Sequence, residues 1–161
     1  MLEINDGYNN LKIDIKNYIS EKIRKIKKID EDDCWCNLYL YIENEYLKLE
    51  NYHYGLECVE VDMLYKVVEE FLNDKLKDNY IFEPLEPSFK MYFYPYGEEY
   101  KDNKYIQENI SSSDKKVKLF IAFIEKDTKA PSSDGIIIDL ELEKVREIFK
   151  YLQNIINKKT K

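Results

Sequence analysis

Short runs in which apolar and polar residues alternate recur along this chain, and they constrain its fold more than any other feature. Leu11, Ile13 and Ile15 alternate with charged residues, which is the period of a half-buried β-strand. Similar patterns predict further strands over residues 38–42, 47–49, 89–94, 117–124 and 136–138. The strand at 117–124 is apolar on both faces over much of its length, so we expect it to be central and covered.

Two longer stretches have the period of an amphipathic α-helix. The first carries an apolar face over residues 61–72, with Asp62 as the expected N-cap of a helix that begins near Met63. The second carries an apolar face from Leu142 to Ile156. We therefore predict an α+β fold with an antiparallel sheet of about five or six strands. Two main helices, at about 62–77 and 141–158, would pack on one face of that sheet.

The length of 161 residues fits a single domain that spans residues 1–161. Only four glycines and four prolines are present, which argues against a Gly-rich nucleotide-binding loop and against a Pro-rich linker. Two segments are less clear. Residues 19–29 fit either a short amphipathic helix or a basic loop, and we favour a solvated connection. The polar stretch 95–116 is long for a loop, which indicates mobility or function.

The formal net charge is −7 and the isoelectric point is about 4.9. Nucleic-acid backbones are bound by clustered Lys and Arg, so we expect no nucleic-acid partner. The acidity either steers the protein towards a basic partner or only keeps it soluble.

Neither a signal peptide nor an apolar run of about 20 residues is visible, so we expect a cytoplasmic protein with no membrane partner. The three cysteines, Cys34, Cys36 and Cys58, are an odd number. In a cytoplasmic protein this fits reduced thiols, and we interpret them as buried side chains.

The sequence contains few candidate residues for catalysis or metal binding. His53 is the only histidine, and its tyrosine neighbours indicate a strand or turn surface. Together with the three cysteines it makes four soft ligands, but no second closely spaced ligand pair completes a zinc site. The acidic run 30–33 lacks the alternation and the glycine of an EF-hand loop. We expect no catalytic residues, no metal and no cofactor.

Tyrosine is the residue type that stands out, with 15 among 161 residues. Several are expected on the outward side of strands: Tyr39, Tyr41, Tyr46, Tyr92 and Tyr94. Tyrosine is enriched in binding surfaces because its rigid ring supplies contact area at a low entropic cost. An AT-rich coding sequence would produce the same excess, and the sequence alone does not separate these two origins.

Several short elements follow one another in an order that resembles a known family. The acidic run leads into a strand that contains Trp35, a residue that we expect in the core, and the segment Glu60-Val61-Asp62 opens a helix. A Phe82-Glu83-Pro84 element then precedes a strand, and a final strand runs into the C-terminal helix. This order is similar to that of the WapI-type immunity proteins of bacterial polymorphic and contact-dependent toxin systems. The order Trp35 then Asn37 departs from the Asn-Trp order of that family.

The resemblance implies an α+β protein that binds and blocks a cognate toxin domain stoichiometrically. Such toxins are often nucleases with basic substrate channels, so an acidic inhibitor is complementary in charge. We expect a free monomer whose partner is a basic toxin domain. From exposure and charge, the candidate partner-binding residues are Asp30, Glu31, Asp32, Asp33, Tyr94, Tyr96, Glu98, Glu99 and Tyr100.

Two other functions remain open. The first is a structural or regulatory protein of a mobile element that self-associates through a Tyr-rich sheet. The second is a hydrolase that uses carboxylates and a metal, for which the sequence offers no motif.

Overall fold

The computed structural model describes residues 1–5, 7–86, 88–97, 115–124 and 131–158, without the side chains of residues 32, 51–54, 124 and 131. Eight strands form two antiparallel sheets of four. Sheet 1 contains, in spatial order, β1 (Leu2–Asn5), β2 (Asn10–Lys16), β3 (Trp35–Glu43) and β4 (Lys48–Glu57). Sheet 2 contains β5 (Tyr80–Phe82), β6 (Phe89–Tyr94), β7 (Lys116–Ile124) and β8 (Pro131–Leu140). The helices are α1 (Glu21–Lys27), α2 (Cys58–Leu72) and α4 (Leu142–Asn157), with a 3-10 turn, η1 (Glu31–Asp33), before β3.

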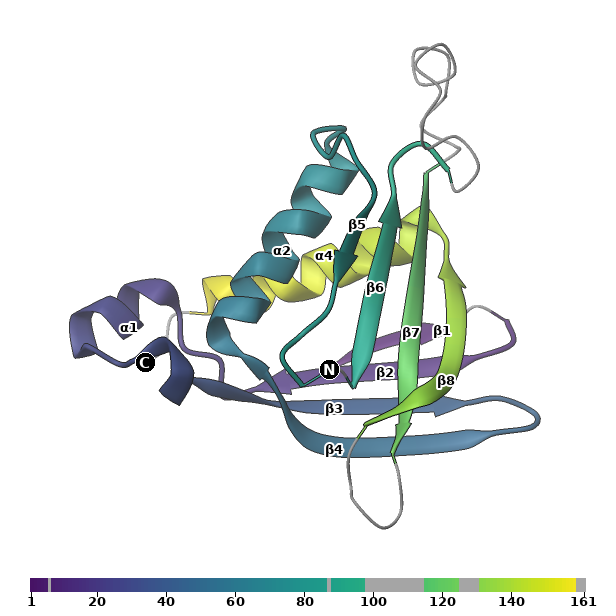
Figure 1. The fold of residues 1–161 in the computed structure, drawn as a ribbon, viewed down its shortest axis with the longest axis horizontal. Helices are drawn as coiled ribbons and strands as arrows, with labels where there is room; N and C mark the ends of the chain where they lie inside the picture. Colours follow the sequence, from purple (N-terminus) through teal and green to yellow (C-terminus); the bar gives the residue numbers. More distant parts are fainter. Residues whose placement is uncertain (6, 87, 98–114, 125–130, 159–161) are drawn as a thin grey trace.

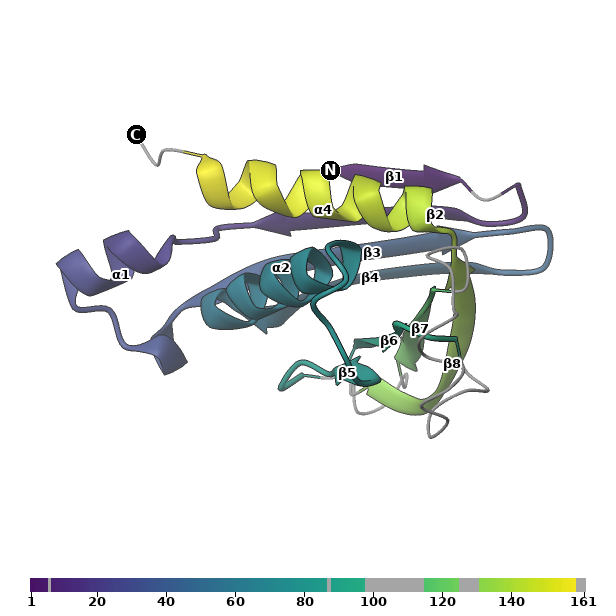
Figure 2. The ribbon, with the colours of Figure 1, turned by 90° about the horizontal axis from the view of Figure 1, so that it is seen from above.

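The strands of sheet 2 run across those of sheet 1, and α2 and α4 lie on the same side of sheet 1 as sheet 2 does (Figures 1 and 2). The predicted α+β class is confirmed. The strands, however, divide between two sheets and are not collected in one sheet of five or six. Strands β1 and β5 were not predicted, because four and three residues are too few to display a period.

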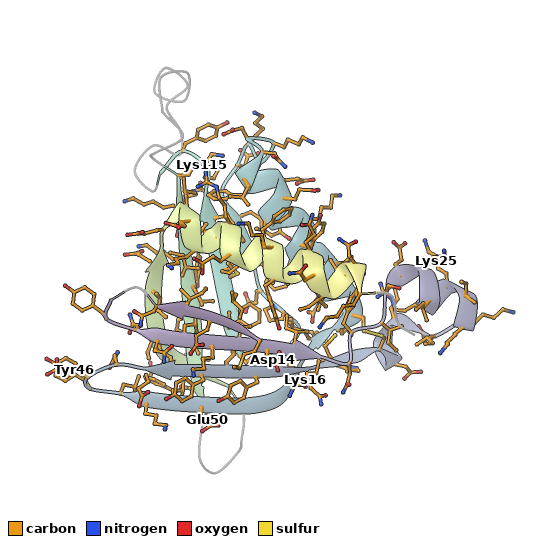
Figure 3. All side chains as sticks on the ribbon, turned by 180° about the vertical axis from the view of Figure 1, so that it is seen from behind. Asp14, Lys16, Lys25, Tyr46, Glu50 and Lys115 are labelled. Atoms are coloured by element: carbon orange, nitrogen blue, oxygen red, sulfur yellow. A yellow bond between two sulfur atoms is a disulfide. The ribbon has the colours of Figure 1, made fainter. Side chains whose placement is uncertain are left out.

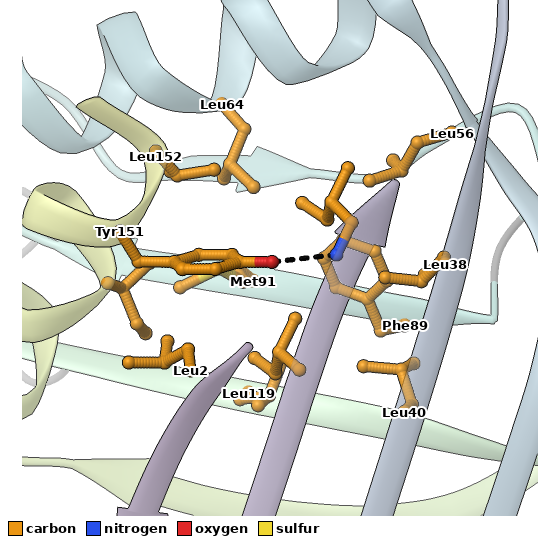
Figure 4. A pocket seen from close by; sticks show the side chains of 13 residues that line it. Leu2, Leu38, Leu40, Leu56, Leu64, Phe89, Met91, Leu119, Tyr151 and Leu152 are labelled. Carbon is orange, nitrogen blue, oxygen red and sulfur yellow. Dashed lines mark hydrogen bonds between the residues drawn. The ribbon is translucent and has the colours of Figure 1, made fainter. Parts of the chain in front are cut away.

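One core joins both sheets to both long helices. Phe71 of α2 meets Phe93 of β6 edge-to-face, with their ring centroids 5.5 Å apart, and both side chains are fully buried. A cavity of about 20 Å³ lies in this core (Figure 4). Its walls are apolar, so we expect it to be dry although one water would fit. The hydroxyl of Tyr151 accepts a hydrogen bond of 2.7 Å from the Ile15 amide beside this cavity.

The N-terminus of α2 differs from the sequence prediction. The helix begins at Cys58, four residues before Asp62, because Glu57 and Glu60 form a capping box. Oε2 of Glu60 accepts a hydrogen bond of 2.8 Å from the Glu57 amide. Its other oxygen, Oε1, accepts one of 2.5 Å from the Leu85 amide, so Glu60 also holds the connection between β5 and β6.

Glu60 is almost completely buried, and its removal leaves two amides without their acceptor. We expect Glu60→Ala to lower the free energy of unfolding by about 2 kcal/mol, since hydrogen bonds to a charged group are among the stronger ones. Glu60→Gln keeps one acceptor oxygen and should cost less. Urea denaturation followed by circular dichroism measures both variants. Equal stability of Glu60→Ala and the unmodified protein would contradict this role.

Residues 21–27, for which we favoured a solvated connection, form helix α1. The helix is held by Arg24, which is only 4% exposed although its neighbours in the sequence are basic and exposed. Nη2 of Arg24 lies 2.6 Å from the Asp62 carboxylate on α2, and Nη1 donates to the Ile19 carbonyl. The Tyr18 hydroxyl donates to the other oxygen of Asp62. Asp62 is therefore the anchor of α1 and not the cap of α2.

The expectation of reduced thiols is wrong for two of the three cysteines. Cys34 and Cys58 form a disulfide that joins the end of η1 to the first residue of α2. Cys36 is a free thiol. All three side chains are buried, as predicted. Since disulfides are typical of oxidising compartments, the cytoplasmic location stays a prediction.

Candidate protein-binding surface

Sheet 1 is covered on one side only in the part of the chain that the structure describes. Along β3, the even-numbered residues from Cys36 to Ile42 are buried in the core. The odd-numbered residues between them are half-buried, and because side chains alternate along a strand they lie on the opposite side, away from the core that contains α2 and α4. Trp35, Tyr39 and Tyr41 lie on that side together with charged residues from the neighbouring strands. We call this surface the tyrosine face, and its charged members are Glu3, Lys12, Glu43, Lys48 and Glu50.

Tyr41 lies at the centre of the tyrosine face. Nζ of Lys12 is 5.6 Å from the centroid of its ring, and Nζ of Lys48 is 5.4 Å from the same centroid. Both distances are in the range of cation–π contacts. The hydroxyl of Tyr41 donates a hydrogen bond of 2.5 Å to Glu43. The ring is therefore fixed in position before any partner binds.

Tyr39 is held in a similar way, because its hydroxyl donates a hydrogen bond of 3.2 Å to Glu50 across the β3–β4 pair. The hydrogen bond to Glu43 raises the pKa of Tyr41 to about 12, and desolvation raises the pKa of Tyr39. Both phenols therefore stay protonated at neutral pH. Figure 3 shows Glu50 on the side of β4 that is turned away from the helices.

Paired charges border the aromatic centre. Nζ of Lys12 lies 2.8 Å from a carboxylate oxygen of Glu3, and this contact raises the pKa of Lys12. Asp14 is 3.1 Å from the N-terminal ammonium group and 3.4 Å from Nζ of Lys16. An aromatic centre with a polar rim is the usual anatomy of a protein–protein interface.

The predicted acidic run lies just before β3, next to the end of the strand that carries Trp35. Asp30, Glu31 and Asp33 are exposed at η1, while the side chain of Asp32 lies outside the described part. The run ends two residues before Trp35, and the disulfide at Cys34 fixes the connection between them. We call residues 30–33 the acidic turn. The acidic turn therefore lies next to the end of β3 that carries Trp35.

The second predicted group of partner-binding residues lies elsewhere. Tyr94 is the last residue of β6 and Tyr96 lies in the turn that follows, and both are half-buried. This end of β6 and the acidic turn lie at different ends of the molecule (Figure 1). Glu98, Glu99 and Tyr100 lie outside the described residues. The two groups therefore do not form one site among the residues described.

Trp35 was expected in the core, but it is half-buried on the outward side of β3. The sequence held the signal that places it there, because Trp35, Tyr39 and Tyr41 share one phase of the alternation while Cys36 and Leu38 share the other. Tyr92 and Tyr94 are outward on β6, as predicted. Tyr46 is 89% exposed at the tip of the β3–β4 hairpin (Figure 3).

Among the described residues, no group of three or more His, Cys, Asp or Glu side chains is arranged to hold a metal ion. No helix in the described ranges is long and apolar enough to cross a membrane. Comparison with known proteins finds no matching family model, no matching curated protein and no matching solved structure. The resemblance to WapI-type immunity proteins therefore stays a prediction.

Proposed function

We propose that this protein is an immunity protein that binds a cognate bacterial toxin domain and neutralises it by stoichiometric inhibition. The observation that carries the proposal is the tyrosine face, an uncovered sheet surface with fixed aromatic side chains at its centre. Aromatic residues that are held in place before binding lose little entropy in a complex, and a few such residues commonly supply most of the binding energy.

Charge favours a basic partner. The protein carries a net charge of −7, and the exposed carboxylates of the acidic turn lie just before Trp35, at one end of the tyrosine face. Complementary charge raises the association rate more than the affinity, so binding should slow as the salt concentration increases. A nuclease with a basic substrate channel has the matching chemistry. We propose that the protein acts in the cytoplasm, by binding and not by catalysis.

The toxin gene of such a system is expected next to the immunity gene. The experiment is to co-express this chain with the C-terminal domain of the large secreted protein encoded beside it. We expect growth to be rescued and a one-to-one complex to elute in size-exclusion chromatography with light scattering. Toxicity that persists, with no complex, contradicts the proposal. A stable homo-oligomer of this chain alone would support self-association through the sheet instead.

A further inference from the structure

Three sulfur atoms lie together where η1, β3 and α2 meet. Cys34 and Cys58 form the disulfide, and Sγ of the free Cys36 lies 3.7 Å from Sγ of Cys58. All three side chains are at most 3% exposed. The free thiol of Cys36 is therefore next to the sulfur of Cys58, which belongs to both possible disulfides, Cys34–Cys58 and Cys36–Cys58.

Backbone contacts hold the sulfur of Cys58 in place beside the free thiol. Cys58 is the first residue of α2, so the helix sets the position of its backbone. The Ile19 amide donates a hydrogen bond of 3.4 Å to Sγ of Cys58. The Cys58 amide donates one of 2.7 Å to the Cys34 carbonyl, so the two backbones are held together without the disulfide as well.

We propose that Cys34, Cys36 and Cys58 form a thiol–disulfide exchange switch that ties the acidic turn to α2 in one state and frees it in the other. In the exchange, the Cys36 thiolate attacks Sγ of Cys58, the Cys36–Cys58 bond forms and the Cys34–Cys58 bond breaks. Cys34 leaves as a thiolate and takes up the proton that Cys36 lost. One disulfide replaces another, so the step needs no oxidant or reductant.

The two states differ in what the covalent bond holds. In the Cys34–Cys58 state, the bond fixes the end of η1 and with it the acidic turn. In the Cys36–Cys58 state it joins α2 to β3 at a position that is already paired with Leu56 of β4. The exchange therefore loosens the acidic turn and leaves the tyrosine face in place. The exchange itself is independent of the proposed function, and only its effect on partner affinity depends on it.

The exchange should be slow at neutral pH. Burial raises the pKa of the Cys36 thiol to about 12, although the nearby Arg24 of α1 acts in the opposite direction. Asp62 and Glu60 of α2 are the other charged groups that influence it, and both raise the pKa. The thiolate is the nucleophile, and its fraction increases with pH. As long as the pH is below this pKa, the rate should therefore increase about tenfold for each unit by which the pH is raised.

The test maps the disulfide in the full-length protein. The protein is incubated at about pH 7 and about pH 9, and free thiols are then trapped with N-ethylmaleimide in acidic denaturant. Fragment-ion mass spectrometry locates the label on Cys34 or on Cys36. We expect the label on Cys36 at first and its gradual appearance on Cys34, about 100-fold faster at the higher pH. The Cys36→Ser variant is the control and should show no free thiol at any time.

The proposal is overturned if the label stays on Cys36 at both pH values. The incubation must last as long as the denatured protein needs to reach exchange equilibrium. A second measurement uses Cys34→Ser, which should form the Cys36–Cys58 disulfide when the native protein is treated with glutathione disulfide. Two free thiols after that treatment also overturn it. Toxin binding by Cys36→Ser is measured separately, so that failure of the switch and failure of the proposed function give different results.

Discussion

The Asp62→Ala variant should lose about 3 kcal/mol of its free energy of unfolding, because it leaves the buried guanidinium of Arg24 without a counter-charge. Asp62 is the carboxylate 2.6 Å from Nη2 of Arg24, and it also accepts a hydrogen bond from Tyr18. An uncompensated charge in the interior is far more costly than a lost surface ion pair. Chemical denaturation followed by circular dichroism gives the value.

A double variant separates two effects of Asp62→Ala, the loss of the ion pair and the cost of a buried guanidinium without a counter-charge. Arg24→Met removes the charge and keeps an apolar stem of similar length, so the Arg24→Met/Asp62→Ala protein should recover more than half of the loss. The exposed ion pair between Lys25 and Glu21 on the same helix is the matched control, and Glu21→Ala should change the stability by less than about 0.5 kcal/mol. If Asp62→Ala costs no more than this control, Arg24 is not buried against α2.

The Tyr39→Ala/Tyr41→Ala variant should bind the toxin domain about 100-fold more weakly, since anchoring aromatic residues at the centre of an interface commonly contribute more than 1 kcal/mol each. Both rings are on the uncovered side of β3, so their removal opens no cavity in the core. The hydroxyls of Tyr39 and Tyr41 donate to Glu50 and Glu43, which are side chains of the same surface. Isothermal titration calorimetry measures the affinity.

Tyr46→Ala is the control for this variant, because Tyr46 is 89% exposed at the hairpin tip and lies outside the aromatic centre. We expect its affinity to change less than about twofold. Circular dichroism should show that all variants keep the fold. Equal affinities of the double variant and the control would place the interface elsewhere on the molecule.

Local patterns predicted most of the regular structure. The period-2 runs gave the positions of β2, β3, β6 and β7, and the period-3.6 runs gave α2 and α4. Helix α2 was placed too late, because Asp62 has the chemistry of an N-cap while the capping box of Glu57 and Glu60 is formed by residues less common at that position. Helix α1 was not favoured because its anchor, the ion pair of Arg24 with Asp62, joins residues 38 positions apart.

The arrangement of the candidate surface also could not be predicted from local patterns, because it depends on pairing between strands that are distant in the sequence. Tyr39 and Tyr41 were predicted to be outward, but only the register of β2, β3 and β4 brings Lys12, Lys48 and Glu50 around them. The disulfide required Cys34 and Cys58 to meet across 24 residues, which a count of cysteines does not reveal. The acidic turn and the end of β6 looked equally suitable in the sequence, and the structure places the acidic turn next to Trp35 and the end of β6 at a different end of the molecule.

Hydroxyl-radical footprinting of the complex with the toxin domain tests the tyrosine face most directly, because it reports the solvent access of individual aromatic side chains. Trp35, Tyr39 and Tyr41 are half-buried in the free protein and open to oxidation. We predict that their oxidation falls at least about fivefold in the complex, as expected for residues desolvated at an interface centre, while that of Tyr92 and Tyr94 on β6 stays the same. Protection of Tyr92 and Tyr94, with Trp35, Tyr39 and Tyr41 unchanged, would contradict the proposed binding surface.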